Sequence, residues 1–256
     1  MTHHSTLDQL AQLRFHGMAN ALRDQLAQPE IERLSFTERL GLLLDREISD
    51  RASRSLTARL RRAKLHQNAC MEDIDYRSAR GLDQRQMLQL ASCDWIRRHL
   101  NVILTGPTGT GKSYLACALA HKACLEGFRT RYHRLPRLLE ELGVARADGR
   151  YLKVLDSLRK LDVLVLDDWG LIHLSQTQQE DLFQLLDDRI QKRSTIATSQ
   201  LPVEHWHQNM ANPTIADALL DRLVQPAYRI ELMGESMRKR LTEPSNESNE
   251  TTTKQM

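Results

Sequence analysis

The 256-residue sequence contains few cysteines, few aromatic residues and almost no net charge. Its four cysteines show no C-x-x-C spacing and its ten histidines no H-E-x-x-H motif, which disfavours both a disulfide framework and a zinc site. Aromatic residues make up 5%, less than a surface that stacks single-stranded bases usually carries. The sequence has 36 basic and 33 acidic residues, so the charges nearly balance and contact with nucleic acid would require a local basic patch.

The sequence also lacks an apolar run of the roughly 18 residues that a membrane span needs. Residues 1–10 contain neither the basic nor the apolar segment of a secretory signal. We therefore expect a cytoplasmic protein that has no membrane partner. With 41% hydrophobic and 27% charged residues, the composition is typical of a folded chain, with one large domain or one domain and a smaller appendage.

The N-terminal part of the chain shows helical periodicity, with leucines recurring at helical spacing from Leu7 onward. Ser35 and Glu38 have the spacing of a capping box, and apolar residues follow on one face. The first hundred residues are therefore predicted to be helical. Within them we expect a small helical domain over residues 1–65 and a linker over residues 66–98.

From residue 101 onward, short β-branched or aliphatic runs alternate with amphipathic helical stretches. The predicted strands cover residues 101–105, 129–133, 162–166, 195–198 and 228–232. Helices are predicted between them, including residues 114–125 and 178–191. This alternation predicts a parallel sheet covered by helices on both faces, in a main domain over residues 99–240. Residues 241–256 are rich in Ser, Asn, Thr and Glu and are predicted to form a disordered tail.

Residues 106–113, GPTGTGKS, match the phosphate-loop pattern G-x-x-x-x-G-K-[ST]. Glycines let the backbone wrap around phosphates, and successive N–H groups form an anion nest at the start of a helix. Lys112 is expected to reach the β- and γ-phosphates, and Ser113 to supply a hydroxyl to Mg²⁺. The alternative is a Gly- and Thr-rich loop without a ligand, but the strand before it and the helix after it favour a nucleotide site. The predicted nucleotide-binding residues are Gly106, Pro107, Thr108, Gly109, Thr110, Gly111, Lys112, Ser113 and Tyr114.

Residues 161–168, LDVLVLDD, form an aliphatic strand that ends in two carboxylates. Ligands of open parallel sheets bind at this end of the strands. We expect Asp167 to hold Mg²⁺ and Asp168 to polarise the attacking water. Many related ATPases have Glu at the second position, so the shorter Asp predicts slow hydrolysis. A buried strand ending in an ordinary turn is the alternative, but the position 55 residues after Lys112 favours the catalytic interpretation.

One further polar segment and two arginines have both a functional and an ordinary interpretation. Residues 198–200, Thr-Ser-Gln, end a predicted strand and either sense the γ-phosphate or form a plain polar turn. Arg222 either forms a salt bridge with Asp221 or another neighbour, or acts as an arginine finger on an adjacent subunit's ATP. Arg238 either reaches the γ-phosphate of its own subunit or belongs to a solvated basic run.

Together these motifs resemble the IstB-like transposition helper ATPases, which are AAA+ proteins related to the DnaC/DnaI helicase loaders. The resemblance covers the chain to about residue 240. It is carried by LGLLLDREISDRASRSLTARLRRAKL, MEDIDYRSARGLD, GPTGTGKSYLACAL, LVLDDWG, ATSQLP, DALLDRL and GESMRK. It implies an AAA+ P-loop NTPase fold, with a five-stranded parallel sheet in the order 5-1-4-3-2. It also implies a preceding helical domain and little or no C-terminal lid.

The resemblance also implies roles for single residues. Lys112 and Ser113 match the Walker A pair, and Asp167 and Asp168 match Walker B. Gln200 is the favoured sensor-one residue, Arg222 matches the finger that acts in trans, and Arg238 matches sensor two. Ile74 and Tyr76 fall where the linker packs near adenine, although plain core packing is the alternative. The implied cofactors are ATP and Mg²⁺.

A run of basic residues without acids lies between Asp50 and Glu72. Its members are Arg51, Arg54, Arg59, Arg61, Arg62 and Lys64. They form either a solvated helix face or a surface that tracks DNA phosphates. A second candidate surface consists of Arg146, Arg150 and Lys153. No base-reading motif is present, so duplex binding is expected to be largely independent of sequence. The N-terminal helices are alternatively a dock for a partner protein.

The resemblance implies an ATP-dependent, DNA-binding homo-oligomer that recruits and stimulates an insertion-sequence transposase. ATP hydrolysis, expected to be slow and stimulated by assembly or a partner, would control disassembly. A replicative helicase loader is the alternative, with the same fold and a different client. A small-molecule kinase is disfavoured because the sequence offers no substrate-binding insert.

Overall fold

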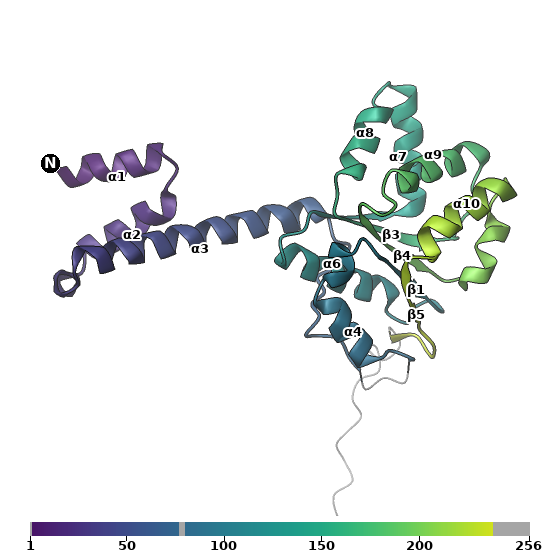
Figure 1. Ribbon diagram of the computed structural model, residues 1–256, viewed down its shortest axis with the longest axis horizontal. Helices are drawn as coiled ribbons and strands as arrows, with labels where there is room; N and C mark the ends of the chain where they lie inside the picture. The colour runs from purple at the N-terminus through teal and green to yellow at the C-terminus, as the bar shows by residue number, and fades with distance from the viewer. Residues whose placement is uncertain (1, 77–79, 238–256) are drawn as a thin grey trace, which may run out of the picture. The chain divides into compact units, whose positions relative to one another are not determined.

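The computed structural model describes residues 2–76 and 80–237 (Figure 1). Arg238 and the predicted tail lie outside the described residues. The chain divides into two compact units, Met1–Arg62 and Ala63–Met256. Among the described residues, no helix combines the length and the apolar character that a membrane span requires.

The N-terminal unit is helical, as predicted. It contains α1 (Thr2–Gln12), α2 (His16–Leu26), the 3₁₀ helix η1 (Pro29–Arg33) and α3 (Phe36–Ala63). The predicted capping box at the start of α3 is confirmed: the Ser35 N–H donates to Glu38 Oε2 at 2.7 Å, and the Glu38 N–H donates to Ser35 Oγ at 3.3 Å. Gly17 of α2 lies so close to α3 that a Cβ there would stand 2.7 Å from the Glu47 Cα. Glycine therefore permits the close approach of these two helices.

The second unit contains the predicted five-stranded parallel sheet. Its strands are β1 (Asn101–Thr105), β2 (Thr130–Arg134), β3 (Val163–Trp169), β4 (Ser194–Ser199) and β5 (Ala227–Glu231). The spatial order is β2-β3-β4-β1-β5, which is the predicted order read from the other edge. All neighbouring pairs are parallel. The carboxyl ends of the strands therefore meet at one edge of the sheet, where ligands of such folds bind.

Helices cover both faces of the sheet (Figure 1). On one face lie α4 (Gln84–Ala91), α5 (Asp94–Arg97) and α6 (Lys112–Leu125), packed on side chains such as Val102 and Val163. On the other face lie α7 (Leu135–Ala147), α8 (Tyr151–Arg159), α9 (Gln176–Asp187) and α10 (Pro213–Val224), packed on side chains such as Ile103 and Leu164. Neighbouring strand residues thus enter opposite cores, as the period of two in a strand dictates.

Two details of the sequence analysis were wrong. The helix predicted over residues 178–191 runs as α9 from Gln176 to Asp187, because Ser175 caps it earlier than expected. Gln191 has φ +54°, a left-handed conformation that ends helical structure. The described residues between 64 and 83 are loops and turns, so the helical prediction for the first hundred residues was too broad.

Candidate nucleotide-binding site

The phosphate loop connects β1 to α6 and has a backbone that only glycine accommodates. Gly106 and Gly109 have φ of +137° and +86°. A Cβ at Gly106 would overlap the Leu232 carbonyl oxygen, and one at Gly109 would overlap the Ser236 side chain. Glycine is therefore needed at both positions for the loop to pack against residues 232–236, and the positive φ values give the tight turns of a phosphate-binding loop.

Lys112 opens α6 and is almost buried, with 7% of its surface exposed. Its Nζ donates to the carbonyl oxygens of Gly106 and Pro107, at 2.8 Å in each case. The ammonium group thus lies inside the loop that precedes it, beside the positive end of the helix. A phosphate at this position would meet a cation, a helix N-terminus and the loop N–H groups together.

Asp167 of β3 is the point at which four elements meet. Its carboxylate accepts hydrogen bonds from Ser113 Oγ of α6 at 3.0 Å, from Tyr132 Oη of β2 at 2.5 Å and from Thr198 Oγ1 of β4. Burial and the bond to Asp167 both raise the pKa of Tyr132, so this phenol remains a hydrogen-bond donor. The two predicted Mg²⁺ ligands, Ser113 and Asp167, are therefore in contact, and both offer the oxygen atoms that Mg²⁺ prefers.

Asp168 has an unusual backbone and an unexpected partner. Its φ is +64°, and it falls where the pairing of β3 with β4 shifts between Leu166 and Trp169. Arg134, the last residue of β2, donates from Nε to Asp168 Oδ2 at 2.7 Å, and Nη2 lies 2.6 Å from the same oxygen. The Arg134 pKa is raised by this hydrogen bond. The predicted water-polarising carboxylate is thus held in an ion pair within its own chain.

The segment after β4 also reaches the phosphate loop. Thr108 Oγ1 donates to Gln200 Oε1 at 2.8 Å, so the favoured sensor-one side chain lies against the loop. Thr198, two residues earlier, donates to Asp167 and accepts a bond from the Asp168 N–H at 3.3 Å. Within residues 198–200, Thr198 therefore contacts the acidic pair Asp167 and Asp168, and Gln200 contacts the phosphate loop.

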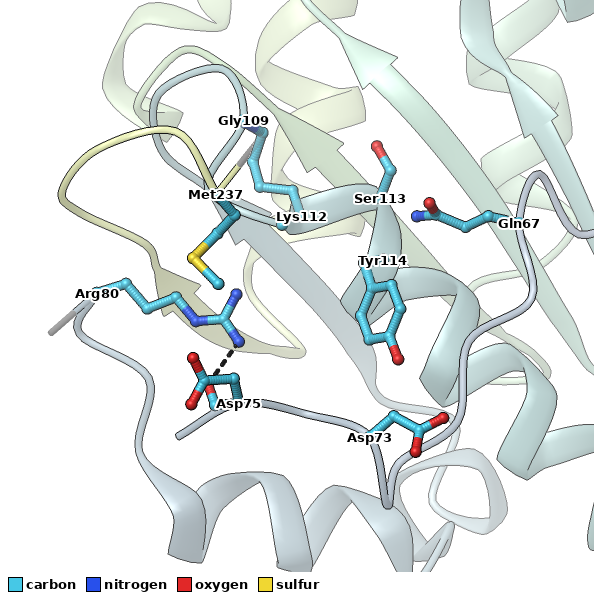
Figure 2. A pocket seen from close by; sticks show the side chains of 10 residues that line it. Gln67, Asp73, Asp75, Arg80, Gly109, Lys112, Ser113, Tyr114 and Met237 are labelled. Carbon is cyan, nitrogen blue, oxygen red and sulfur yellow. Dashed lines mark hydrogen bonds between the residues drawn. The ribbon is translucent and has the colours of Figure 1, made fainter. Parts of the chain in front are cut away.

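A cavity of about 460 Å³ lies beside the loop (Figure 2). Its lining residues are Gln67, Asp73, Asp75, Arg80, Gly109, Gly111, Lys112, Ser113, Tyr114 and Met237. Figure 2 shows Arg80 and Met237 on one side and Tyr114 and Asp73 on the other. Ile74 belongs to the buried core and Tyr76 packs against it, and neither lines this cavity. Ile74 and Tyr76 therefore pack in or against the core, which was the alternative to a position beside adenine.

Arg80, which no sequence motif indicated, is 6% exposed and joins the linker to the loop. Its Nη1 donates to the Thr110 carbonyl at 3.0 Å, and its Nη2 donates to the Asp75 carbonyl at 2.9 Å. Its Nε is buried without a hydrogen-bond partner. Burial lowers the Arg80 pKa. A buried cation next to the phosphate loop, with an unused donor, is the kind of group that an anionic ligand compensates.

Arg222 lies at the opposite end of the sheet from the loop of its own chain. Its carbonyl accepts a bond from Asn101 Nδ2 at 3.3 Å, and Asn101 begins β1, roughly 13 Å before the end of that strand. The Arg222 Nε donates to Asp187 Oδ1 at 2.7 Å, and its guanidinium lies 4.7 Å from the centre of the Phe183 ring. The salt bridge considered for Arg222 therefore exists, with Asp187 instead of Asp221. Arg222 does not join the acidic pair of its own subunit.

The basic run of α3 is partly engaged by its own helix. Arg54 Nη2 lies 3.6 Å from the Glu47 carboxylate, and Arg59 donates to a neighbouring serine hydroxyl at 2.7 Å. Arg61 and Arg62 are exposed, and within the described chain no carboxylate lies within 4.0 Å of either. The end of the run therefore has the most available positive charge.

The second candidate surface has less available charge. Arg146 forms an ion pair with Asp181, and Arg150 donates from Nε to Asp148 at 2.9 Å. Lys153 is exposed on α8. Two of these three cations thus already have carboxylate partners, which weakens the case for a phosphate-tracking surface here.

Comparison with known proteins identifies the family. Residues 8–245 match the sequence model of the family described as IstB-like ATP binding protein. A Sinorhizobium fredii protein, named as an insertion sequence ATP-binding protein, is 51% identical over 239 residues, which cover 93% of this chain and 98% of that protein. A Pseudomonas fluorescens protein, named as the ATP-binding protein of insertion sequence IS1162, is 53% identical over 203 residues, 79% of this chain and 87% of that protein.

Among solved structures, the crystal structure of DnaI matches with a TM-score of 0.57 and 23% identity, over 64% of this chain and 91% of that chain. This likeness concerns the fold, which is that of an AAA+ P-loop protein. The predicted family resemblance is thus confirmed by a match over most of the sequence, by close relatives and by the fold. The chain belongs to the family of IstB-like ATP-binding proteins.

Proposed function

We propose that the protein is an ATPase that assembles as a homo-oligomer on duplex DNA and recruits and stimulates the transposase of its insertion sequence. It hydrolyses ATP to ADP and phosphate slowly, faster after assembly or partner binding, and hydrolysis controls disassembly. One observation carries the ATPase assignment. The Asp167 carboxylate accepts hydrogen bonds from Ser113, the last residue of the phosphate-loop motif, and from Thr198 near the end of β4. This contact joins the two motifs that phosphoryl transfer requires.

The residues of the loop support ATP binding. The loop N–H groups and the Lys112 ammonium would hold the phosphates, and Tyr114 lines the adjoining cavity. Ser113 and Asp167 would hold Mg²⁺, which neutralises phosphate charge when bound. Arg238, the proposed sensor-two contact with the γ-phosphate, lies outside the described residues.

For hydrolysis, we assign to Asp168 the orientation of the attacking water and the acceptance of its proton. We assign the sensing of the nucleotide to Gln200, and its contact with Thr108 of the loop supports this role. The ion pair between Arg134 and Asp168 supports a low basal rate, because the carboxylate already has a cationic partner.

Arg222 supports an oligomer-dependent reaction. Its side chain is 25% exposed and lies near the start of β1, away from the loop that follows β1. It therefore has no route to its own nucleotide, and we assign it to the nucleotide of an adjacent subunit, where it would neutralise charge on the transferred phosphoryl group.

The DNA and transposase contacts rest on charge and on the insertion-sequence relatives. We propose that the domain over residues 1–65 contacts DNA or the transposase, with Arg54, Arg59, Arg61 and Arg62 on its last helix. Residues 66–98 form the segment beside the nucleotide, residues 99–240 the ATPase domain and residues 241–256 a tail. Arg150 and Lys153 are a weaker second set. Phosphate contacts alone predict binding that depends on salt and little on sequence.

A helicase loader is the second candidate, favoured by the fold likeness to DnaI. The insertion-sequence relatives, at 51% and 53% identity, favour the transposition helper. The two functions differ in the client protein and share the ATPase cycle.

The test combines assembly and client capture. Electron microscopy of the purified protein should show assemblies only when ATP and duplex DNA are both present. Immobilised protein, loaded with ATP and DNA, should then retain the transposase encoded beside it and release it as ATP is hydrolysed. Retention of the replicative helicase instead would assign the loader function, and ATP-independent assembly would contradict the ATPase cycle.

A further inference from the structure

A second large cavity lies along β2, the edge strand of the sheet. It measures about 640 Å³ and is bounded by β2, by α7 and by residues 64–66. Basic groups from all three segments line it. They are Lys64, His66, Arg131, His133, Arg134 and Arg137. Arg134 is paired with Asp168, and none of the other five belongs to the proposed nucleotide site.

The charges of this cavity are only partly compensated. Two acids, Glu140 and Glu141 of α7, also line it. The Glu141 carboxylate stands 4.0 Å from the His133 Nδ1, which is a charged pair only when that histidine is protonated. Within residues 2–76 and 80–237, however, Lys64, Arg131 and Arg137 have no carboxylate within 4.0 Å. Positive charge in the cavity therefore remains available for a ligand.

Two buried nitrogen atoms in the lining also have no partner. The Arg131 Nε and the His133 Nε2 are both buried without a hydrogen bond. Native proteins rarely leave such groups unsatisfied, because each costs about 1–3 kcal/mol. Burial, together with the nearby charges of Arg131 and Lys64, lowers the pKa of His133 to about 4. A ligand with several acceptor oxygens would compensate the cations and offer acceptors to the Arg131 guanidinium, which lines the cavity.

Phosphate has this chemistry. Guanidinium groups bind it through paired N–H donors, and an ammonium group adds a point charge. His66 stacks on Tyr132 with ring centroids 5.7 Å apart and an interplanar angle of 11°, which gives the cavity one flat wall. Arg146 and Arg150, by contrast, already have carboxylate partners. The cavity is therefore better supplied with free positive charge than the surface of α7 and α8 beyond it.

We propose that this cavity binds a phosphate group of the nucleic-acid backbone on which the protein assembles. The proposal rests on the proposed function for the identity of the ligand. A backbone phosphate suits the site better than a free one, because the cavity is larger than one phosphate and because Lys64 and His66 are exposed for contact with neighbouring nucleotides. It adds a DNA contact to those considered on α3 and to the weaker set of Arg150 and Lys153 in the ATPase unit.

The test is the salt dependence of duplex binding by the full chain in the presence of ATP. The variant Arg131→Gln/Arg137→Gln removes two charges from the cavity. Its affinity should fall, and the slope of log K against log salt should decrease by roughly 0.9 for each DNA phosphate that the variant no longer neutralises. The control Arg85→Gln/Arg98→Gln removes two exposed charges, one on α4 and one directly after α5, neither of which lines this cavity, and should keep the wild-type slope. Arg131→Lys/Arg137→Lys, which retains the charge, should also keep most of the slope. ATP affinity should be unchanged in all three.

Three results would overturn the proposal. If Arg131→Gln/Arg137→Gln keeps the wild-type slope while neutralising Arg59, Arg61 and Arg62 lowers it, DNA contacts lie on α3, and the proposed function stands. If the cavity variant fails only to bind inorganic phosphate, measured by calorimetry, the cavity takes free phosphate. If it fails only to retain the transposase, the cavity docks an acidic protein segment. A wild-type protein that binds no duplex DNA at any salt concentration would contradict the proposed function itself.

Discussion

Arg134 and Asp168 form an ion pair that joins the ends of two neighbouring strands: Arg134 Nη2 lies 2.6 Å from Asp168 Oδ2. Arg134 is the last residue of β2, and Asp168 lies where the pairing of β3 with β4 shifts between Leu166 and Trp169. The carboxylate to which we assign the attacking water thus has a cation as its partner. The Arg134 side chain is 50% exposed and the Asp168 side chain 18%, so solvent screens this ion pair and either residue can be substituted without disturbing the core.

We expect Arg134→Gln to raise the ATPase rate measured without DNA. A partly exposed ion pair is worth about 0.2–1 kcal/mol, so release of the carboxylate should raise turnover by up to about fivefold. ATP affinity should stay within a factor of about two, because Arg134 does not line the cavity beside the loop. Steady-state phosphate release measures the effect. A fall in turnover to the level of Asp168→Ala would show that Arg134 positions the carboxylate and does not restrain it.

Lys112→Ala should abolish nucleotide-dependent assembly. Removal of a charge-assisted contact with phosphate costs about 1.5–3 kcal/mol, so ATP affinity should fall by a factor on the order of 10 to 100. A fluorescent ATP analogue measures binding, and light scattering measures assembly. Lys122→Ala is the matched control on the same helix, since it removes only the ion pair with Glu126. Assembly of Lys112→Ala with the ATP dependence of the wild type would contradict the phosphate-site assignment.

Asp168→Ala should bind ATP normally and hydrolyse it poorly. Loss of a positioned proton acceptor lowers a rate by about 10²- to 10⁴-fold. If hydrolysis controls disassembly, the variant should remain on DNA longer, which DNA dissociation after dilution into excess competitor measures. Unchanged turnover would remove Asp168 from the catalytic residues. Asp167 would then be the carboxylate to test next, because it contacts Ser113.

Arg222→Ala should retain ATP binding and lose most hydrolysis, an effect on the order of 10³-fold in the best cases. Mixing distinguishes a role in trans. Lys112→Ala subunits have an inactive nucleotide pocket and an intact Arg222, whereas Arg222→Ala subunits have an intact pocket and lack the arginine. Mixed assemblies of the two should partly recover ATPase activity, because some interfaces place an intact pocket beside an intact Arg222.

The control for this experiment is Asp187→Asn, which removes the partner of Arg222 within the chain and leaves the arginine in place. It should retain hydrolysis. If it loses hydrolysis as Arg222→Ala does, and if proven mixed assemblies stay inactive, Arg222 acts through the salt bridge that joins α10 to α9.

Gly17→Ala should destabilise the N-terminal unit by about 1–3 kcal/mol, the usual cost of inserting a methyl group into a tight contact. The added Cβ would stand 2.7 Å from the Glu47 Cα and 2.9 Å from the Arg46 carbonyl oxygen. Gly41→Ala, in α3 with nothing within 4 Å of its added Cβ, should instead stabilise the helix by about 0.5–1 kcal/mol. Thermal unfolding followed by far-ultraviolet circular dichroism compares the two. Equal effects of the two substitutions would exclude the close contact of α2 and α3.

Local sequence patterns predicted the fold class and the two halves of the nucleotide site. Runs of aliphatic or β-branched residues identified the three central strands β1, β3 and β4, because these are buried on both faces. The edge strands β2 and β5 have more mixed sequences, and their positions were still predicted. The capping box at Ser35 and the loop before Lys112 were also evident, since each depends on residues within one short segment. The end of α9 was predicted less well, because the apolar spacing of Leu186 and Ile190 continues after the helix has stopped.

By itself, then, the sequence determined which residues form the phosphate loop, the acidic strand end and the strands that hold them, because these features depend on neighbours in the chain. Tertiary structure alone decided their partners. Tyr132 and Arg134 reach the acidic pair because β2 lies beside β3, with Arg134 paired with Asp167 in the sheet. Arg80 reaches Thr110 across thirty positions, and Arg222 binds Asp187 across thirty-five. Such contacts follow from the order of strands and the packing of helices, which periodicity within a segment does not encode.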